Sequence, residues 1–113
     1  GSPCRSTLAH LWDARFTLAL AFSVLFGTGC GAAYYSYEIV TATRVVEQAR
    51  QGEAPDLAPY EFQLAESYLV KAREEGSSAE YLDAIELAGE ARLAGEKAIA
   101  IARRRRQSRG DAP

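Results

Sequence analysis

Apolar side chains recur at helical spacing in three segments after residue 30. The segment 33–51 carries a stripe with steps of four and three residues, made of Tyr35, Ile39, Ala42, Val46 and Ala49. The segment 59–75 repeats the pattern with Phe62, Ala65, Leu69 and Ala72. The segment 78–106 repeats it again with Leu87, Ala91, Ala94, Ala98 and Ile101. This period predicts three amphipathic helices, each with one buried face.

Helix-breaking residues set the expected bounds of these helices. Gly52 is typical of a C-terminal stop, and the two prolines that follow it argue against a helix in the linker, because proline lacks an N–H group. Pro59 suits the first position of the second helix. Gly76 should end that helix, and Ser77, with Glu80 three residues later, is typical of the capping box of a third helix.

The short connection at 76–77 makes the second and third helices antiparallel neighbours, and the linker folds the first helix back on the second. We therefore expect an all-α fold, a three-helix up-down-up unit. The last turns of the third helix should reach beyond the second helix. They leave Ala98, Ile99 and Ile101 to pack on the linker, on another copy or on a different protein, so these residues are partner-binding candidates.

An apolar run, Phe16 to Phe26, precedes these helices and follows Arg15. Its length matches the roughly 7–15 residues of a secretory h-region. With Cys30 and the small residues before it, the run resembles the lipobox of bacterial lipoproteins, although a glycine stands where that motif usually has leucine. The resemblance implies cleavage before Cys30 and acylation of its thiol. The expected cleavage region consists of Gly27, Thr28 and Gly29.

The expected domain order is a signal peptide, a helical domain and a disordered tail. The signal peptide covers 1–29, with an n-region at 1–15, an h-region at 16–26 and a cleavage region at 27–29. The helical domain covers 30–107, and the tail covers 108–113. The expected location is the bacterial cell envelope, anchored in a membrane by the lipid and facing the periplasm, with the outer membrane favoured over the inner.

An uncleaved anchor is the alternative. No residue from Phe16 to Tyr37 is charged, and these 22 residues are enough to span a bilayer. The chain would then be a single-pass inner-membrane protein whose helical tail is an accessory subunit of a membrane complex.

Charge and chemistry narrow the function. The net charge of −2 does not favour a nucleic-acid-binding protein. Cleavage before Cys30 would remove His10 and Cys4, and acylation would block the remaining thiol, so we expect no enzyme activity, no metal and no cofactor. The carboxylate pairs Glu74–Glu75 and Glu86–Glu90 should lie on exposed helix faces, where nothing raises a carboxyl pKa for acid–base work.

The dense cationic cluster of Arg103, Arg104, Arg105 and Arg106 lies near the end of the third helix. Cations there complement the helix dipole. They also suit an acidic envelope protein or an anionic envelope polymer. Both interpretations stay open from the sequence.

The antiparallel alanine-rich pair of helices is similar to one unit of a tetratricopeptide-type repeat. A closer resemblance lies in the run from Ala54 to Phe62, followed by Ala65 to Leu69 and Ala72. These residues resemble the bacterial domain-of-unknown-function family numbered 4398, short exported helical proteins that often carry a lipobox. The resemblance covers about Cys30 to Arg103 and implies an envelope location and no defined activity. The expected function is a non-catalytic adaptor or structural subunit.

Overall fold

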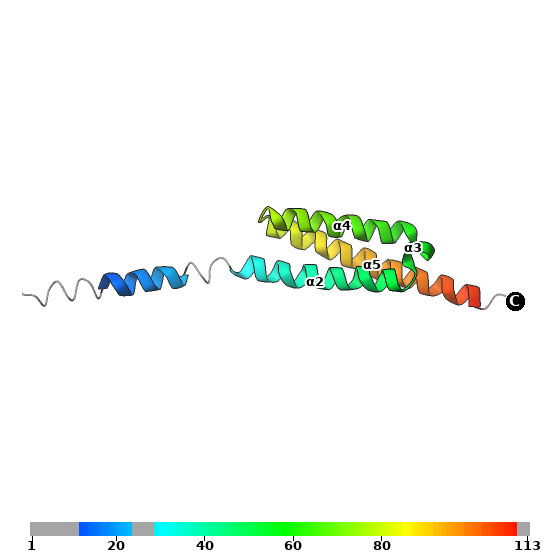
Figure 1. Ribbon diagram of the computed structural model, residues 1–113, viewed down its shortest axis with the longest axis horizontal. Coiled ribbons are helices and arrows are strands. Elements are labelled where there is room, and N and C mark those ends of the chain that lie inside the picture. The colour runs from blue at the N-terminus through cyan, green and yellow to red at the C-terminus, as the bar shows by residue number, and fades with distance from the viewer. Residues whose placement is uncertain (1–11, 24–28, 111–113) are drawn as a thin grey trace, which may run out of the picture. The chain divides into compact units, whose positions relative to one another are not determined.

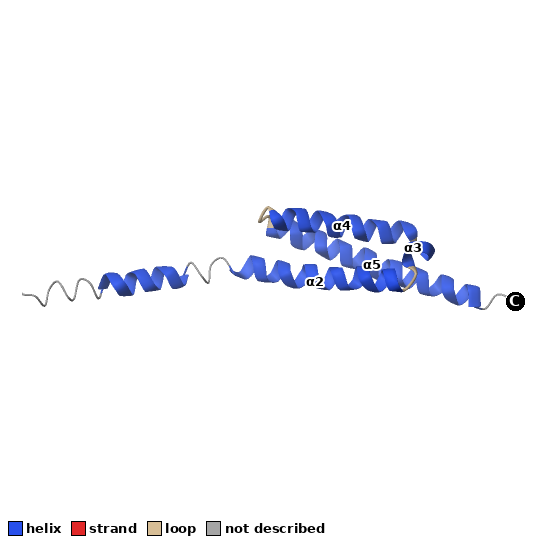
Figure 2. Ribbon diagram, in the orientation of Figure 1, coloured by secondary structure: helices blue, strands red, loops and turns tan. Residues whose placement is uncertain are grey.

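The computed structural model describes residues 12–23 and 29–110, and every regular element in those ranges is a helix (Figures 1 and 2). The predicted all-α class is confirmed. A first helix covers 12–23. The helices that follow are α2 (Gly29–Gln51), α3 (Ala54–Leu57), α4 (Pro59–Ser77) and α5 (Tyr81–Gly110). The chain divides into two compact units between Cys30 and Gly31.

Within the second unit, α2 and α5 run in one direction and α4 runs in the other (Figure 1). Contacts between side chains fix the register of these helices. Arg73 of α4 donates a hydrogen bond of 3.2 Å to Thr43 of α2. Arg50, near the end of α2, donates to Glu66 of α4 and lies 5.6 Å from the centroid of the Phe62 ring.

The core of this unit is built mostly from alanine. The stripe predicted for α4 is confirmed, because Phe62, Ala65, Leu69 and Ala72 are all buried. The α2 stripe is confirmed for Ala42, Val46 and Ala49, whereas Tyr35 and Ile39 are only half-buried. On α5 the buried side is wider than the predicted stripe and is rotated toward smaller residues; it consists of Ala84, Ala88, Ala91, Ala94, Gly95, Ala98 and Ala102. Leu87 and Ile101 are only half-buried at its margins.

Small side chains on α5 let the helices approach closely. A Cβ atom at Gly95 would lie 2.9 Å from Cγ1 of Val45 and 3.7 Å from Cγ2 of Val46. The first of these separations is shorter than normal van der Waals contact, so a larger residue at this position would force Val45 to shift.

The turn between α4 and α5 differs from the prediction. Gly76 lies inside α4, which continues to Ser77, and Ser77 donates to the carbonyl of Glu74 at 2.7 Å instead of capping the next helix. The chain leaves α4 through Ala79, whose φ of 63° is left-handed. The amide of Glu80 donates to the carbonyl of Glu75 at 2.9 Å, and that of Ala79 to Gly76 at 3.2 Å. This is the hydrogen-bond pattern of a Schellman motif, so α5 starts at Tyr81 and the predicted capping box is wrong.

The linker also differs from the prediction. It contains the short helix α3, and Pro55 is tolerated there because the first turn of a helix needs no N–H donor. Glu53, with a φ of 65°, makes the turn into α3. The predicted bounds at Gly52 and Pro59 are confirmed, since α2 ends at Gln51 and α4 begins at Pro59.

The third helix begins three residues later and ends four residues later than predicted. Helix α5 continues to Gly110, so 108–110 are helical and not part of a disordered tail, while 111–113 lie outside the described residues.

Candidate functional site

The first candidate site is Cys30, in the first turn of α2. Its thiol is exposed and forms no disulfide. Gly29, the last residue of the expected cleavage region, begins α2 and is also exposed. Gly27 and Thr28 lie outside the described residues. The thiol that the sequence predicts to be acylated is therefore accessible to solvent.

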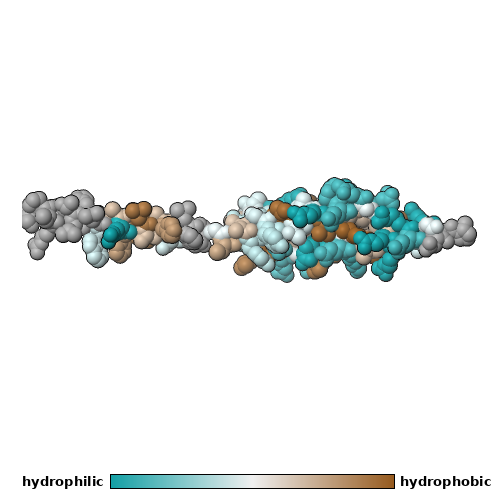
Figure 3. Space-filling model, turned by 90° about the horizontal axis from the view of Figure 1, so that it is seen from below, coloured by the Kyte–Doolittle hydropathy of each residue, from teal (hydrophilic) through white to brown (hydrophobic). Residues whose placement is uncertain are grey.

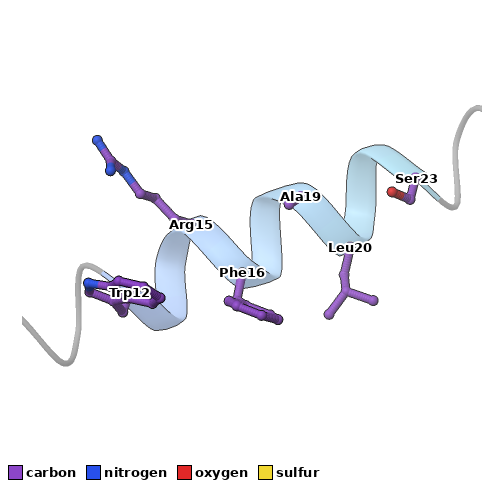
Figure 4. Close-up of a pocket in the computed structure, with 6 residues that line it drawn as sticks. All are labelled: Trp12, Arg15, Phe16, Ala19, Leu20 and Ser23. Atoms are coloured by element: carbon purple, nitrogen blue, oxygen red, sulfur yellow. The ribbon is translucent and has the colours of Figure 1, made fainter.

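The helix over 12–23 is apolar on more than one side. Trp12, Phe16 and Leu20 project along one side around a shallow hollow (Figure 4), and Leu18 and Phe22 are exposed as well. Within 12–23 and 29–110, no helix is both long and apolar enough to cross a membrane.

The second candidate site is the C-terminal part of α5. The inner side of these turns is buried within the single chain: Ala98 is fully buried, Ala102 is 1% exposed, and α3 packs on α5. Ile99 and Ile101 are half-buried at the edge of the same core.

The four consecutive arginines of α5 divide into two kinds. Arg105 turns toward α3 and donates a hydrogen bond to the carbonyl oxygen of Leu57, the last residue of that helix. Arg103, Arg104 and Arg106 are exposed, and among the described residues none of them has an ion-pair or hydrogen-bond partner. One arginine therefore secures the fold, and the other three are free for a ligand.

Other surface cations are used within the chain. Lys71 lies 2.9 Å from Glu75 and 3.3 Å from Glu74, and hydrogen bonds to these carboxylates raise the pKa of Lys71 above its usual 10.5. Arg92 pairs with Glu96 at 3.1 Å.

The end of the second unit where α2 starts and the end that carries the arginines lie far apart. A Cβ atom at Gly31 would touch the ring of Tyr81, so α2 and α5 start at the same end of the bundle. Arg105 contacts Leu57 at the other end. At 1.5 Å per residue, the helix between Tyr81 and Arg105 is roughly 35 Å long. The face visible in Figure 3 is correspondingly pale to tan near the start of α2 and mostly teal toward the end of α5.

The carboxylate pairs differ in exposure. Glu74, Glu86 and Glu90 are exposed, whereas Glu75 is half-buried, and both Glu74 and Glu75 pair with Lys71. Across the described part of the chain, no three His, Cys, Asp or Glu side chains are grouped so that they could hold a metal ion.

The family model described as "Domain of unknown function (DUF4398)" matches residues 38–112. The chain belongs to the DUF4398 family. The match covers nearly the whole helical unit, from within α2 to beyond the end of α5, including the arginine cluster. No curated protein and no solved structure gives a significant match. In this DUF4398 chain, functional inference therefore depends on its own residues.

The sequence interpretation missed two features of α5. It treated the four arginines as one group, although their helical positions could have separated Arg105, which follows Ala98 and Ala102 on the inner side, from the rest. It also followed only the buried side of α5. The exposed side has its own regular spacing, which is described below.

Proposed function

We propose that this DUF4398 protein is a small bacterial cell-envelope lipoprotein that acts as a non-catalytic helical adaptor or structural subunit. Its signal peptide, 1–29, is removed, and Cys30 carries the lipid. Residues 31–110 form a three-helix up-down-up unit with a tetratricopeptide-like hairpin of α4 and α5, and this unit faces the periplasm from a membrane, with the outer membrane favoured over the inner.

The separation of the two ends of the helical unit is the observation that supports this proposal best. Cys30 immediately precedes Gly31, which lies at the end where α2 and α5 start. The unpaired Arg103, Arg104 and Arg106 lie at the other end of α5. A lipid at Cys30 would therefore hold the cations away from the anchoring leaflet. At that distance they can attract an acidic protein surface or an anionic polymer without competition from lipid headgroups.

The second candidate is a single-pass inner-membrane protein whose helical tail is an accessory subunit of a membrane complex. The charge-free run from Phe16 to Tyr37 favours it. In that case the apolar segment stays attached and Cys30 is not acylated.

Metabolic labelling with a fatty-acid analogue tests the proposal. The unchanged chain and the Cys4→Ser variant should both take up label, because Cys4 lies in the segment that is removed. The Cys30→Ser variant should take up none and should accumulate as the uncut precursor. Equal label on the unchanged chain and on Cys30→Ser would contradict the lipoprotein proposal.

A further inference from the structure

A row of exposed side chains runs along α5 outside its buried face, and three acidic members of the row also line a hollow with Tyr68 and Glu75 of α4. The steps between its members alternate between three and four residues, which keeps them on one side of the helix. We call it the outer row, and it consists of Asp83, Glu86, Glu90, Leu93, Lys97, Ala100 and Arg104. Its charges are segregated: the N-terminal half is acidic and the C-terminal half is basic.

The charges of the outer row have no partners inside the chain. None of its five charged side chains forms an ion pair within residues 12–23 and 29–110, although pairs occur elsewhere on this surface, such as Arg92 with Glu96. Glu86 and Glu90 lie four residues apart, where like charges repel each other along a helix. The arrangement therefore costs stability within a single chain.

The helix dipole does not account for this pattern. Its effect on charged side chains falls off within the first and last turns of a helix. Glu90 and Lys97 lie well inside α5, which extends from Tyr81 to Gly110. A charge pattern that continues through the middle of the helix calls for a complementary surface beside it.

We propose that the outer row binds the outer row of a second copy of this chain, with the two α5 helices antiparallel. A two-fold axis beside Leu93 would place the acidic half of each row against the basic half of the other row. Glu90 lies three residues before Leu93 and Lys97 four after it, so each faces the other across the axis. Asp83 and Arg104, ten before and eleven after, match in the same way.

This pairing is closed, because each copy contributes the same patch to it. Leu93, 52% exposed in the single chain, would meet its symmetry mate at the axis, and the small Ala100 would face Glu86. The apolar area is modest, so the association depends on charge and weakens as salt rises. This pairing rests on the proposed adaptor role and names a second copy of the chain as the partner of α5. It does not depend on the lipid anchor.

Disulfide trapping in the full chain tests the pairing. The Leu93→Cys variant places two thiols beside the proposed axis, whereas Ser67→Cys places one on the exposed side of α4 as a matched control. Because pairing raises the effective concentration of the two thiols, Leu93→Cys should give about tenfold more disulfide dimer than Ser67→Cys under mild oxidation. Equal amounts of dimer from the two variants would overturn the proposal.

Charge exchange in the Leu93→Cys chain tests the antiparallel arrangement. One variant carries Glu86→Lys with Glu90→Lys, and the other carries Lys97→Glu with Arg104→Glu. Each alone should fall to the dimer yield of Ser67→Cys, because its two rows repel. A mixture of the two should recover the yield as a heterodimer, since a basic row then faces an acidic one. Undiminished dimer from either variant alone, or no recovery in the mixture, would overturn the proposal.

Capture on poly-glutamate beads separates this inference from the adaptor role. The unchanged chain should bind the beads, and the Lys97→Glu with Arg104→Glu variant should bind several-fold less. If binding to the beads depends on these cations but Leu93→Cys traps no dimer, the adaptor role stands and the pairing of two copies is wrong. If the dimer forms but poly-glutamate is not bound, the pairing stands and recognition of a foreign acidic partner is wrong.

Discussion

The ring of Tyr35 fills the space that a side chain at Gly76 would occupy. A Cβ atom built at Gly76 would overlap the Cε2, Cζ and hydroxyl oxygen atoms of Tyr35. The Tyr35 ring also lies beside the ring of Tyr81, with the two centroids 5.8 Å apart and the ring planes tilted by 40°. Gly76 therefore joins α4 to α2 and, through the tyrosine pair, to the start of α5.

Gly76→Ala should destabilise the protein by about 1–2 kcal/mol, although alanine is the better helix former, because the tyrosine ring must leave its contact with Tyr81. The matched control is Gly89→Ala on α5, where a Cβ atom meets nothing within 4 Å. Gly89→Ala should stabilise by about 0.5–1 kcal/mol. Thermal melts of both variants, at concentrations that keep the chain monomeric, measure the two effects. A stabilising Gly76→Ala would show that the Tyr35 contact is not formed.

Ala79→Gly should raise stability, because Ala79 holds the left-handed conformation that glycine adopts at little cost. The expected gain is about 1 kcal/mol. Chemical denaturation measures it, and Ala100→Gly, at an exposed helical position, is the control that should lose a similar amount. A loss of stability in both variants would argue against the Schellman turn.

Arg105→Ala should cost about 1 kcal/mol, since it removes the hydrogen bond that ties the end of α5 to the Leu57 carbonyl and leaves that oxygen without its donor. Arg104→Ala, one residue earlier and exposed, should change stability by less than about 0.5 kcal/mol. Denaturant titration compares the two variants. Equal effects would mean that Arg105 does not hold α3.

Leu69→Ala should cost about 2–4 kcal/mol, because Leu69 is 6% exposed in a core whose other members are mostly alanine. Its neighbour Val70 is 55% exposed, so Val70→Ala should cost less than about 0.5 kcal/mol. A thermal melt of Leu69→Ala shifted by no more than that of Val70→Ala would place Leu69 outside the core.

Periodicity predicted the helices and their buried faces well, because burial of one side of a helix leaves a regular trace in the sequence. Phe62, Ala65, Leu69 and Ala72 are buried as their spacing indicates. Proline and glycine also marked the bounds at Gly52 and Pro59 correctly.

The turn at the end of α4 could not be predicted from local sequence. Gly76 is a residue type that often ends a helix, but here it lies inside α4. A side chain at this position would collide with the ring of Tyr35, which lies forty-one residues earlier in the chain. Ala79, which does make the turn, carries no local signal for a left-handed conformation. Tertiary contacts decide both positions, and sequence propensity does not record them.

The arginine cluster shows the same limit at the candidate site. The sequence identified Arg103 to Arg106 as a group but could not show that α3 would form and present the Leu57 carbonyl to Arg105. Helical spacing alone places Arg105 on the inner side of α5, but its hydrogen bond depends on how the linker folds.

The intact mass of the protein extracted from bacterial membranes tests the central claim most directly. If the chain is a lipoprotein, its mass corresponds to a polypeptide that begins at Cys30 and carries a diacylglycerol group on the thiol, and peptide fragmentation places the lipid on Cys30. The mass of a chain that retains Phe16 to Phe26 and has an unmodified thiol at Cys30 would contradict the account.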